Sequence, residues 1–522
     1  MAWIVTVVMW IQGRPAYNPS FILRTMTTPA PPVPDPTQRR RALPPLYVDL
    51  DGTLVHSDTL HESVLLLLRR SPWFLLRLLW WVLAGKAAFK RRVAEHARPD
   101  PAQLPYTPAL LEWLRAERAA GRMLVLATAA DARVAQAVAE HLQLFDAVLA
   151  SNAGAADVNL SRHRKREAIE RHAQALGHTH YAYAGNSSAD LPVWAGAHEA
   201  VAVNAPPAVL RRLLAEHPQA RVFPAQPATV RQWLKAVRLS QWAKNALLFV
   251  PLLAAHRWEL LVWAQVALAF VAFGLCASAT YLINDLLDLP NDRRHAHKRH
   301  RPLAAGRIAI APAVGAMALM FPLAYALAWA VSPGFFGVLA FYTAVTLAYS
   351  FHWKRVALLD VLVLSGLYTL RLMAGALAAD VDLSNWLLAI SLFLFLGLAL
   401  VKRCAELEEV LQDTAVDCAR GRGYHQDDLP ALRTMGVASG FLTVMVLALY
   451  IDSQNGRELY AQPVWLWGAV PLLLWWIMRI WLKTGRRELH GEDPLQFALH
   501  DRFSWAVLAG LALLGALASW GL

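Results

Sequence analysis

The segment YLINDLLDLPND, residues 281–292, decides how most of this chain is interpreted. It closes a long apolar stretch and places Asp285, Asp288 and Asp292 three and four residues apart, which puts them on one face of a helix. Carboxylates at the margin of an apolar span are costly unless they are paired or bind cations, so the cluster indicates a functional site. Mg²⁺ binds a few carboxylates and shares its other positions with substrate phosphates. We therefore predict a Mg²⁺ site formed by Asn284, Asp285, Asp288 and Asp292.

A basic run, HKRHRP at residues 297–302, follows the acidic cluster directly. It would neutralise a diphosphate beside the metal, which favours a site over a loop with ordinary surface acids. Arg371 stands in the middle of a later apolar stretch, where an arginine has no topological purpose, and its structural alternative is a pair with Asp360. For Lys354 and Lys402, a role in fixing the orientation in the membrane explains the residue as well as a contact with substrate does. The residues that we predict to contact substrate phosphates are Lys244, Asn245, Lys298, Arg299, Arg301, Lys354, Arg371 and Lys402.

The composition is typical of a membrane protein with more than one domain. Hydrophobic residues make up 57% of the 522 positions, charged residues only 17%, and there are 21 tryptophans. A chain of this length exceeds what one hydrophobic core normally organises. The net charge of +12 suits nucleic acid, anionic lipid or phosphorylated substrates, and its place along the chain decides between them. Three cysteines without paired spacing indicate neither a disulfide framework nor a cysteine-based zinc site.

From residue 231 to residue 522, apolar segments alternate with charged or Pro/Gly-containing connections. A helix needs ~20 residues to cross a bilayer, so this pattern predicts an all-α polytopic bundle of about nine transmembrane helices. The predicted spans are 243–256, which is short, and 262–283, 308–331, 335–352, 358–378, 385–402, 432–452, 462–482 and 504–521.

Lysine and arginine gather in alternate connections of this region. The connections after the second, fourth, sixth and eighth spans are basic, whereas 332–334 and 379–385 lack lysine and arginine. Because basic loops stay in the cytoplasm, we predict a multi-pass protein of the inner (plasma) membrane whose N-terminal domain and active sites are cytoplasmic. The positive charge then belongs to the membrane surface and to anionic substrates, and we expect no nucleic-acid partner.

The acidic segment and the basic run after it resemble a known family. NDxxDxxxD at residues 284–292, with KRxRPLAAG at residues 298–306, is similar to the first aspartate-rich motif of the UbiA superfamily of intramembrane prenyltransferases. The similarity extends over residues 237–520 and includes VRLSQWAKN near the first span and YSFHWKR before the fifth. It implies a membrane bundle that binds a diphosphate through Mg²⁺ and transfers its carbon group.

Departures from the motif pattern point to one branch. Asp360 is followed four positions on by Leu364, so the second DxxxD pair of many UbiA prenyltransferases is missing. KRCAEL at 402–407, GRGY at 421–424 and GEDPLQFALHDR at 491–502 resemble the decaprenyl-phosphate phosphoribosyltransferase branch. That resemblance implies phosphoribosyl diphosphate as donor and a polyprenyl phosphate as nucleophile. Two alternatives stay open: prenylation of an aromatic ring by a polyprenyl diphosphate, as in quinone or haem A synthesis, and a non-catalytic membrane anchor.

Residues 46–224 show a different pattern. Short β-type runs, namely LYVDLD, MLVLATA, DAVLAS, YAYAGN and AVAVN, alternate with amphipathic stretches. This alternation is typical of a parallel sheet with crossover helices, a Rossmann-like α/β domain. Ligands gather beyond the carboxyl ends of such strands. The polar residues that end these runs include Asp49, Thr128, Asn186 and Asp190.

LYVDLDGTL at residues 46–54 resembles the first motif, DxDGT, of the haloacid dehalogenase superfamily, and its later motifs recur in order. The resemblance implies a phosphatase in which Asp49 is the nucleophile, while Asp51 protonates the leaving group and later activates water. Thr128 and Lys165 would hold the phosphoryl oxygens, and a degenerate, non-catalytic domain is the alternative. The implied Mg²⁺ ligands are Asp49, Asn186, which stands where an aspartate is common, and Asp190.

The predicted helical cap, at about 60–100, is unusually apolar and carries interspersed arginine and lysine. It is typical either of an amphipathic surface on an anionic membrane or of leucine and tryptophan packed within the cap. Residues 1–45 are predicted to form a disordered, proline-rich segment, with Met26 as the candidate for the true start. Because fused domains suggest consecutive steps, we hypothesise that the membrane half makes a polyprenyl-phosphate-linked 5-phosphoribose and that the front domain removes its 5-phosphate.

Overall fold

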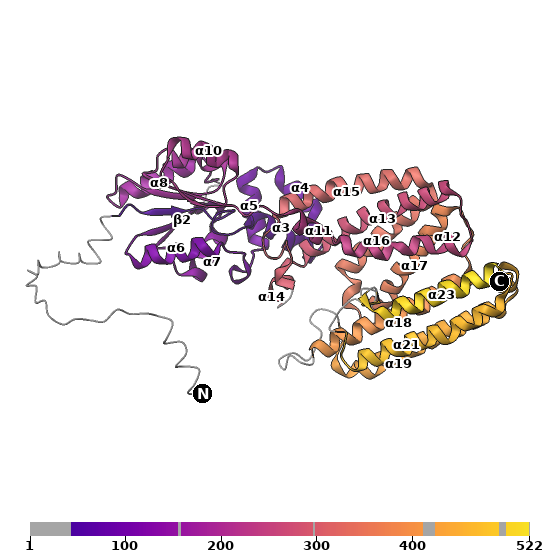
Figure 1. Ribbon diagram of the computed structural model, residues 1–522. Coiled ribbons are helices and arrows are strands. Elements are labelled where there is room, and N and C mark those ends of the chain that lie inside the picture. The colour runs from indigo at the N-terminus through magenta and orange to yellow at the C-terminus, as the bar shows by residue number, and fades with distance from the viewer. Residues whose placement is uncertain are drawn as a thin grey trace, which may run out of the picture.

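The computed structural model describes residues 43–154, 158–295, 298–410, 423–489, 497–498 and 500–520. It divides the chain into a sheet domain, which begins at β1, and a helical domain, which begins at α11 (Figure 1). The predictions for the N-terminal segment up to residue 42, for Met26 and for most of the two late motifs at 421–424 and 491–502 lie outside the described residues.

The sheet domain is built on six parallel strands in the order β3-β2-β1-β4-β5-β6. Alternate residues of β1 point to opposite faces: Leu46 and Val48 join one buried cluster, and Tyr47 joins the other. The predicted α/β architecture is confirmed, and β6 is a strand that the sequence pattern did not indicate. The strands are β1 (Leu46–Val48), β2 (Leu124–Asp131), β3 (Ala147–Ser151), β4 (Ala182–Gly185), β5 (Glu199–Val203) and β6 (Arg221–Phe223).

Helices cover both faces of this sheet, and three more form a cap between β1 and β2 (Figure 1). Asp58 starts the cap by accepting hydrogen bonds from the amides of Leu60 and His61, the ordinary way to satisfy the first turn of a helix. The cap helices are α3 (Thr59–Arg70), α4 (Phe74–Val82) and α5 (Lys86–His96). The others are α6 (Pro108–Ala119), α7 (Ala132–Leu142), α8 (His163–Ala175), α9 (Leu191–Trp194) and α10 (Pro207–Glu216).

The helical domain contains, among the described residues, eight helices long and apolar enough to cross a membrane. The predicted multi-pass bundle is thus confirmed. The short candidate at 243–256 is not among them, because the chain there forms a 3₁₀ helix, Leu239–Phe249, followed by the five-residue α12 (Val250–Ala254). The eight are α13 (Leu260–Leu287), α15 (Ile310–Val331), α16 (Pro333–Phe351), α17 (Leu359–Ala379), α18 (Asn385–Val410), α19 (Leu429–Asp452), α21 (Ala469–Gly485) and α23 (Arg502–Trp520).

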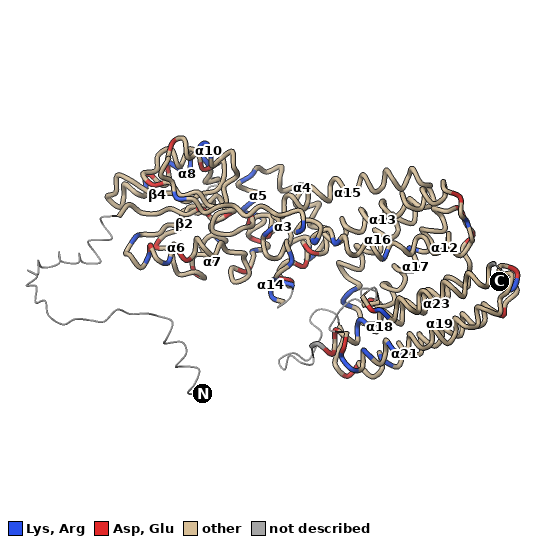
Figure 2. The backbone as a smooth tube through the Cα atoms, in the orientation of Figure 1, with Lys and Arg blue, Asp and Glu red and all other residues tan. Residues whose placement is uncertain are grey.

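Short elements complete the helical domain. They are α11 (Val230–Ala236), α14 (Leu289–Arg294), α20 (Gln454–Leu459) and the 3₁₀ turns Lys298–His300, Trp353–Arg355, Gln426–Asp428 and Pro463–Gly468. Charged residues gather at the ends of the long helices and leave most of their length apolar (Figure 2). The end that faces the sheet domain carries Arg293, Arg294 and Arg301 beside the acidic residues of α13 and α14. This distribution is the one that a bilayer imposes on a bundle.

The two domains are packed together through the cap. Helix α3 contacts α13 and α15, and Leu65 packs against an apolar cluster of the helical domain that includes Leu286. Beside it the carboxylate of Glu62 receives two hydrogen bonds from the guanidinium of Arg293, at 2.9 and 2.7 Å. Both side chains are largely buried, with exposed fractions of 4% for Glu62 and 8% for Arg293. The front domain is therefore held directly against the helix that follows the acidic segment.

Glu62→Gln should loosen this contact. The change leaves the buried Arg293 guanidinium uncompensated, and breaking a buried pair costs about 3–5 kcal/mol. We expect cleavage in the exposed linker, residues 224–229, to become about tenfold faster or more under limited proteolysis. Glu112→Gln, the same change on the exposed face of α6, is the control. Equal cleavage of both variants and the parent chain would show that the pair does not hold the domains together.

Candidate active sites

A cavity of about 720 Å³ lies at the carboxyl end of β1. Its walls come from the sheet domain, from cap helices α3 and α5, and from residues 309–311 at the start of α15. Parallel sheets place ligand sites at this edge, so its position is the one expected for an α/β enzyme. The predicted residues that line it are Asp49, Asp51, Lys165, Asn186 and Asp190. A wall contributed by the helical domain was not foreseen.

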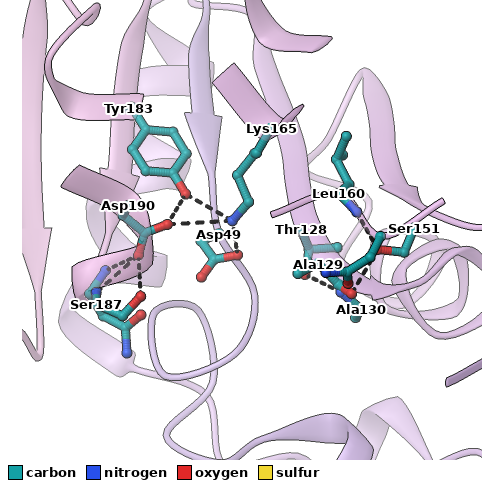
Figure 3. Close-up of polar contacts among 12 residues, drawn as sticks. Asp49, Thr128, Ala129, Ala130, Ser151, Leu160, Lys165, Tyr183, Ser187 and Asp190 are labelled. Carbon is teal, nitrogen blue, oxygen red and sulfur yellow. Dashed lines mark hydrogen bonds and ion pairs between the residues drawn. The ribbon is translucent and has the colours of Figure 1, made fainter. Parts of the chain in front are cut away.

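Lys165 joins two carboxylates of this cavity (Figure 3). Its ammonium lies 2.8 Å from Asp49 Oδ1 and 3.4 Å from Asp190 Oδ1, and it also lies 3.0 Å from the hydroxyl of Tyr183. Asp49 follows β1, whereas Lys165 lies in the first turn of α8. The fold thus brings together residues more than a hundred positions apart, as the motif order implied.

Burial and neighbouring charges shift the pKa values of Asp49, Asp51 and Lys165. Burial raises the pKa of Asp49 to about 6, although the Lys165 ammonium works against this rise. Burial, together with the carboxylate of Asp58, raises the pKa of Asp51 to about 7. For Lys165, burial opposes the charge, but Asp49 and Asp190 outweigh it and raise the pKa. Asp51 is therefore able to donate a proton near neutral pH, as a general acid must.

Asn186 offers an acceptor that nothing in the structure uses. Its side-chain Oδ1 is buried, lines the cavity and has no hydrogen-bond partner. Gly52 lies against it with φ of +76°, and a Cβ built there would stand 2.0 Å from Asn186 Nδ2. Only glycine fits at this point of the DGT turn. An unpartnered buried oxygen beside the Asp49 carboxylate fits a hard cation such as Mg²⁺.

Asp190, a predicted metal ligand, accepts hydrogen bonds from several protein groups in this structure. Its Oδ1 accepts from Tyr183 and Lys165, while its Oδ2 accepts from the amides of Asn186 and Ser187 and from the Ser187 hydroxyl. These donors occupy all the lone-pair positions of a carboxylate. In this arrangement Asp190 orients Lys165 and the Asn186 loop, and its role as a metal ligand stays a prediction.

Thr128, unlike the other predicted residues of this site, is not among the lining residues. Its buried hydroxyl accepts a hydrogen bond from Ala130 N at 3.0 Å, so it shapes the end of β2, and Ala129 and Ala130 form the wall. A cap residue that we did not predict, Lys90, reaches this edge and donates to Ala129 O at 2.6 Å. It also donates to Asn159 Oδ1 at 2.9 Å. The sequence offered only a weak signal for Lys90, one lysine in the basic stretch of α5.

A second cavity, of about 400 Å³, opens in the helical domain where the end of α13 faces α17 and α18. Apolar side chains form part of its wall, including Leu364 and Phe395. Acidic and basic residues from distant parts of the sequence meet on the rest of it. The predicted residues that line it are Lys244, Asn284, Asp285, Asp288, Lys298, Arg301, Lys354 and Lys402.

Cations already surround the two lining aspartates. Asp285 is paired with Arg238 and, at 3.2 Å, with Arg301. Lys354 binds Asp288 with its ammonium 2.8 and 3.0 Å from the two carboxylate oxygens. In the described part of the chain, no three His, Cys, Asp or Glu side chains lie close enough to hold a metal together. Mg²⁺ requires only one or two carboxylates when substrate phosphates complete its shell, so Asp285 and Asp288 with Asn284 fit it.

Asp292 is turned away from this cavity. It is buried, and Arg301 holds it at 2.7 Å. Burial raises the pKa of Asp292, although Arg301 works against the rise. Arg301 thus forms ion pairs with both Asp285 of α13 and Asp292 of α14. Asp292 positions Arg301, and the predicted three-carboxylate face contributes two acids to the cavity.

Three predicted phosphate contacts do not line the cavity. Arg299 is exposed at the surface, while Asn245 and Arg371 are buried behind the wall. The Arg371 guanidinium donates to Asn245 Oδ1 and to the Tyr342 hydroxyl, both at 3.1 Å. It also lies over the ring of Tyr368, which lines the cavity and receives Lys244 on a face. Arg371 therefore positions the residues that form the wall.

The structural alternative for Arg371, a pair with Asp360, is wrong. Asp360 is instead paired with Arg403, at 2.7 Å between atoms that are completely buried. Arg403 directly follows the predicted sixth span, 385–402, whose following connection we interpreted as basic and cytoplasmic; the residue instead lies buried inside the bundle. Two charged residues that line the cavity were missed: Arg238, and Glu406 four positions after Lys402. The KRCAEL run contained Glu406, but only the packing of α18 turns it toward the cavity.

Arg371→Ala should destabilise the bundle. It removes a buried cation stacked on aromatic rings and leaves Asn245 and Tyr342 without their partner, which we expect to cost about 3 kcal/mol or more. The measurement is the denaturation midpoint of the purified protein in detergent. Arg457→Ala, at an exposed pair on α20, should leave the midpoint unchanged. Equal midpoints for the two variants would contradict the positioning role.

Comparisons with known proteins agree with this division of the chain. Residues 246–507 match the UbiA prenyltransferase family, and residues 46–194 match haloacid dehalogenase-like hydrolase. The Uncharacterized protein y4nM of Sinorhizobium fredii is 38% identical over 471 residues, which cover 90% of each chain. A Decaprenyl-phosphate phosphoribosyltransferase of Mycobacterium tuberculosis is 32% identical over 55% of this chain and 94% of its own. A UbiA homolog from Archaeoglobus fulgidus, solved with DMAPP and Mg²⁺, is 16% identical over 54% of this chain and 99% of its own, with a TM-score of 0.40.

The helical domain and its relatives agree on one family, and the sheet domain carries the matching motifs of another. The chain belongs to the UbiA prenyltransferase family and carries a haloacid dehalogenase-like hydrolase domain in front of the membrane bundle.

Proposed function

We propose that the membrane bundle transfers phosphoribose from phosphoribosyl diphosphate to a polyprenyl phosphate and that the front domain then removes the 5-phosphate of the lipid-linked product. The similarity to decaprenyl-phosphate phosphoribosyltransferases supports the first step. The cavity shared by the cap and the start of α15 supports the second, because it sets a phosphatase site beside the membrane-spanning part of the same chain.

The charge balance of the bundle cavity carries the proposal. Its lining holds six lysines and arginines, against the three acids Asp285, Asp288 and Glu406. Two polyanions, a sugar diphosphate and a lipid phosphate, repel each other, and an excess of cations offsets that repulsion. A prenyl diphosphate and an aromatic acceptor together carry less negative charge, so they need fewer cations. The apolar wall at Leu364 and Phe395 suits the polyprenyl chain.

In the transfer, an oxygen of the lipid phosphate attacks C1 of the ribose. The bond between C1 and the diphosphate oxygen breaks, and pyrophosphate leaves with the bonding electrons. Asp285, Asp288 and Asn284 would hold Mg²⁺, which, when bound, supplies positive charge to the departing diphosphate. Lys298, Lys354 and Arg301, which line the same cavity, stabilise the remaining phosphate charge. The lipid phosphate is already anionic, so no general base is needed.

In the hydrolysis, a carboxylate oxygen of Asp49 attacks the phosphorus of the 5-phosphate. The bond to the ribose oxygen breaks, and Asp51 gives that oxygen its proton. A water, deprotonated by Asp51, then releases inorganic phosphate from Asp49. Lys165, oriented by Asp190, holds a phosphoryl oxygen throughout. Asp49 and Asn186 would hold the Mg²⁺ of this site.

The positions of the charged residues also support an orientation of the protein in the membrane. The basic end of the bundle and the sheet domain lie on the same side (Figure 2). Because basic connections stay in the cytoplasm, we place both active sites on the cytoplasmic face of the inner membrane.

Purified protein tests the proposal directly. With phosphoribosyl diphosphate, a polyprenyl phosphate and Mg²⁺, it should release pyrophosphate first and inorganic phosphate afterwards, and EDTA should stop both. A parallel reaction with radiolabelled polyprenyl diphosphate and an aromatic acid distinguishes the alternative donor. Transfer in that reaction alone would overturn the phosphoribosyl assignment.

A further inference from the structure

Helix α4 of the cap presents an apolar face to the outside of the protein. Leu78 is its one buried residue and packs against α3 and α5. Trp73 and Leu83, at the two ends of the helix, are 77% and 79% exposed, and Leu79 and Trp80 are 61% and 71% exposed. We call the exposed set the α4 patch, and it comprises Trp73, Leu75, Leu76, Leu79, Trp80, Val82 and Leu83. So large a contiguous apolar surface marks an interaction site.

The sequence on both sides of the α4 patch is basic and contains no acidic residue. From Ser63 to Ala94 the chain contains no aspartate or glutamate, while it carries Arg69, Arg70, Arg77, Lys86, Lys90, Arg91 and Arg92. Arg77 and Lys86 are themselves exposed. An apolar helical face with cations around it has the composition of helices that lie in the interface of anionic membranes.

The fold places this patch at the level of the membrane surface. Helix α3 contacts both α4 and α15, and α15 begins its apolar span at Ile310. Only 11% of that span is buried inside the protein, so α15 is a helix at the lipid boundary. Figure 1 shows α4 near the N-terminal end of α15, on the side of the bundle that faces the sheet domain. Helix α3 therefore links α4 directly to a helix that spans the membrane.

We propose that the α4 patch is inserted in the interface of the bilayer that holds the spanning helices, with anionic lipid headgroups around its rim. A protein partner would need a surface that also reaches the membrane boundary, whereas lipid is present there whenever α15 is inserted. Burial of these side chains in lipid removes them from water and holds the cap against the membrane.

The patch also borders the phosphatase cavity. Lys86 lines that cavity and follows the exposed Leu83 by three residues. A substrate whose tail stays in the bilayer would thus meet Lys86 as its phosphate enters. This consequence, unlike the insertion itself, rests on the proposed function of the front domain, and it specifies the substrate class as lipid-linked phosphate monoesters.

Site-specific fluorescence tests the insertion. The full chain, with Cys418→Ser and Leu79→Cys, is labelled with an environment-sensitive dye and reconstituted in phosphatidylglycerol-containing vesicles; Cys276 and Cys404 are buried. We expect a blue-shifted emission, quenched more strongly by lipids with a nitroxide near the headgroup than by lipids with one at the chain end. Arg212→Cys, at an exposed position of α10, is the control and should show neither the blue shift nor the quenching. A shift without quenching would place the patch against protein, in these vesicles a second copy of the chain, and no shift would leave it in water; either result overturns the proposal.

Enzyme assays test the consequence. Leu79→Glu should lower phosphate release from a lipid-linked phosphoribose about tenfold and leave the hydrolysis of p-nitrophenyl phosphate unchanged. Leu176→Glu, at an exposed leucine beyond α8, should affect neither reaction. Quenching with unchanged lipid-linked turnover would overturn the delivery of substrate but not the insertion. If the parent chain hydrolyses neither substrate, the proposed function fails while the fluorescence result stands.

Discussion

Asp285→Asn is expected to abolish pyrophosphate release from phosphoribosyl diphosphate. The Asp285 carboxylate lines the bundle cavity and lies between Arg238 and Arg301, where a cation and a diphosphate would take the place of these pairs. The amide keeps the shape of the side chain but removes its charge. Stabilisation of a leaving diphosphate by a metal is worth several kcal/mol, so we expect a loss of about 10³-fold or more. The measurement is the rate of pyrophosphate formation at saturating Mg²⁺.

The same variant contains its own control for folding. Hydrolysis of p-nitrophenyl phosphate by the front domain should be unchanged, because Asp285 does not line that cavity. Asp452→Asn, at an exposed residue that ends α19, provides the matched substitution. A membrane half that merely anchors a phosphatase would tolerate Asp285→Asn. Undiminished pyrophosphate release would therefore refute the assignment of this cavity as a transferase site.

The acidic segment shows how far spacing alone carries a prediction. Helical periodicity correctly predicted that Asp285 and Asp288 line one cavity. The prediction for Asp292 assumed that the same helix continues to residue 292. Helix α13 ends at Leu287, and Pro290 stands in the first turn of a new helix, α14. Proline has no amide hydrogen and favours such a start. The direction of the chain changes there, which buries Asp292 against Arg301.

Contacts between side chains of different helices could not be predicted from the sequence. Asp360 and Arg371 lie on one helix, but eleven residues separate them, about 16 Å along the axis, which is too far for a direct pair. Arg403 of α18 takes Asp360 instead. The choice depends on how α17 packs against α18, which hydrophobic periodicity does not specify. The pair of Glu62 with Arg293 was unpredictable for the same reason, because it forms only when the two domains meet. The ordered motifs, in contrast, brought most of their residues to one cavity, since Asp49 and Asn186 follow the neighbouring strands β1 and β4.

Asp49→Asn is expected to stop phosphate release while pyrophosphate release continues. The side chain lies 2.8 Å from the Lys165 ammonium at the end of β1, in the position of an attacking nucleophile. An amide nitrogen and a neutral amide oxygen do not attack phosphorus, so we expect a loss of about 10⁴-fold or more. The measurement is the ratio of inorganic phosphate to pyrophosphate formed from phosphoribosyl diphosphate and a polyprenyl phosphate.

The product that accumulates in this variant makes the test decisive. If the two domains act in sequence, Asp49→Asn should leave a lipid-linked sugar that still carries its 5-phosphate, detectable by the mass of the extracted lipid. Adding the Asp285→Asn variant, whose front domain is intact, should then convert that lipid. Asp146→Asn, at a residue that bonds the Leu124 amide far from the cavity lining, is the matched control for the substitution. Normal phosphate release by Asp49→Asn would show that this aspartate is not the nucleophile, and the sequential scheme would lose its second step.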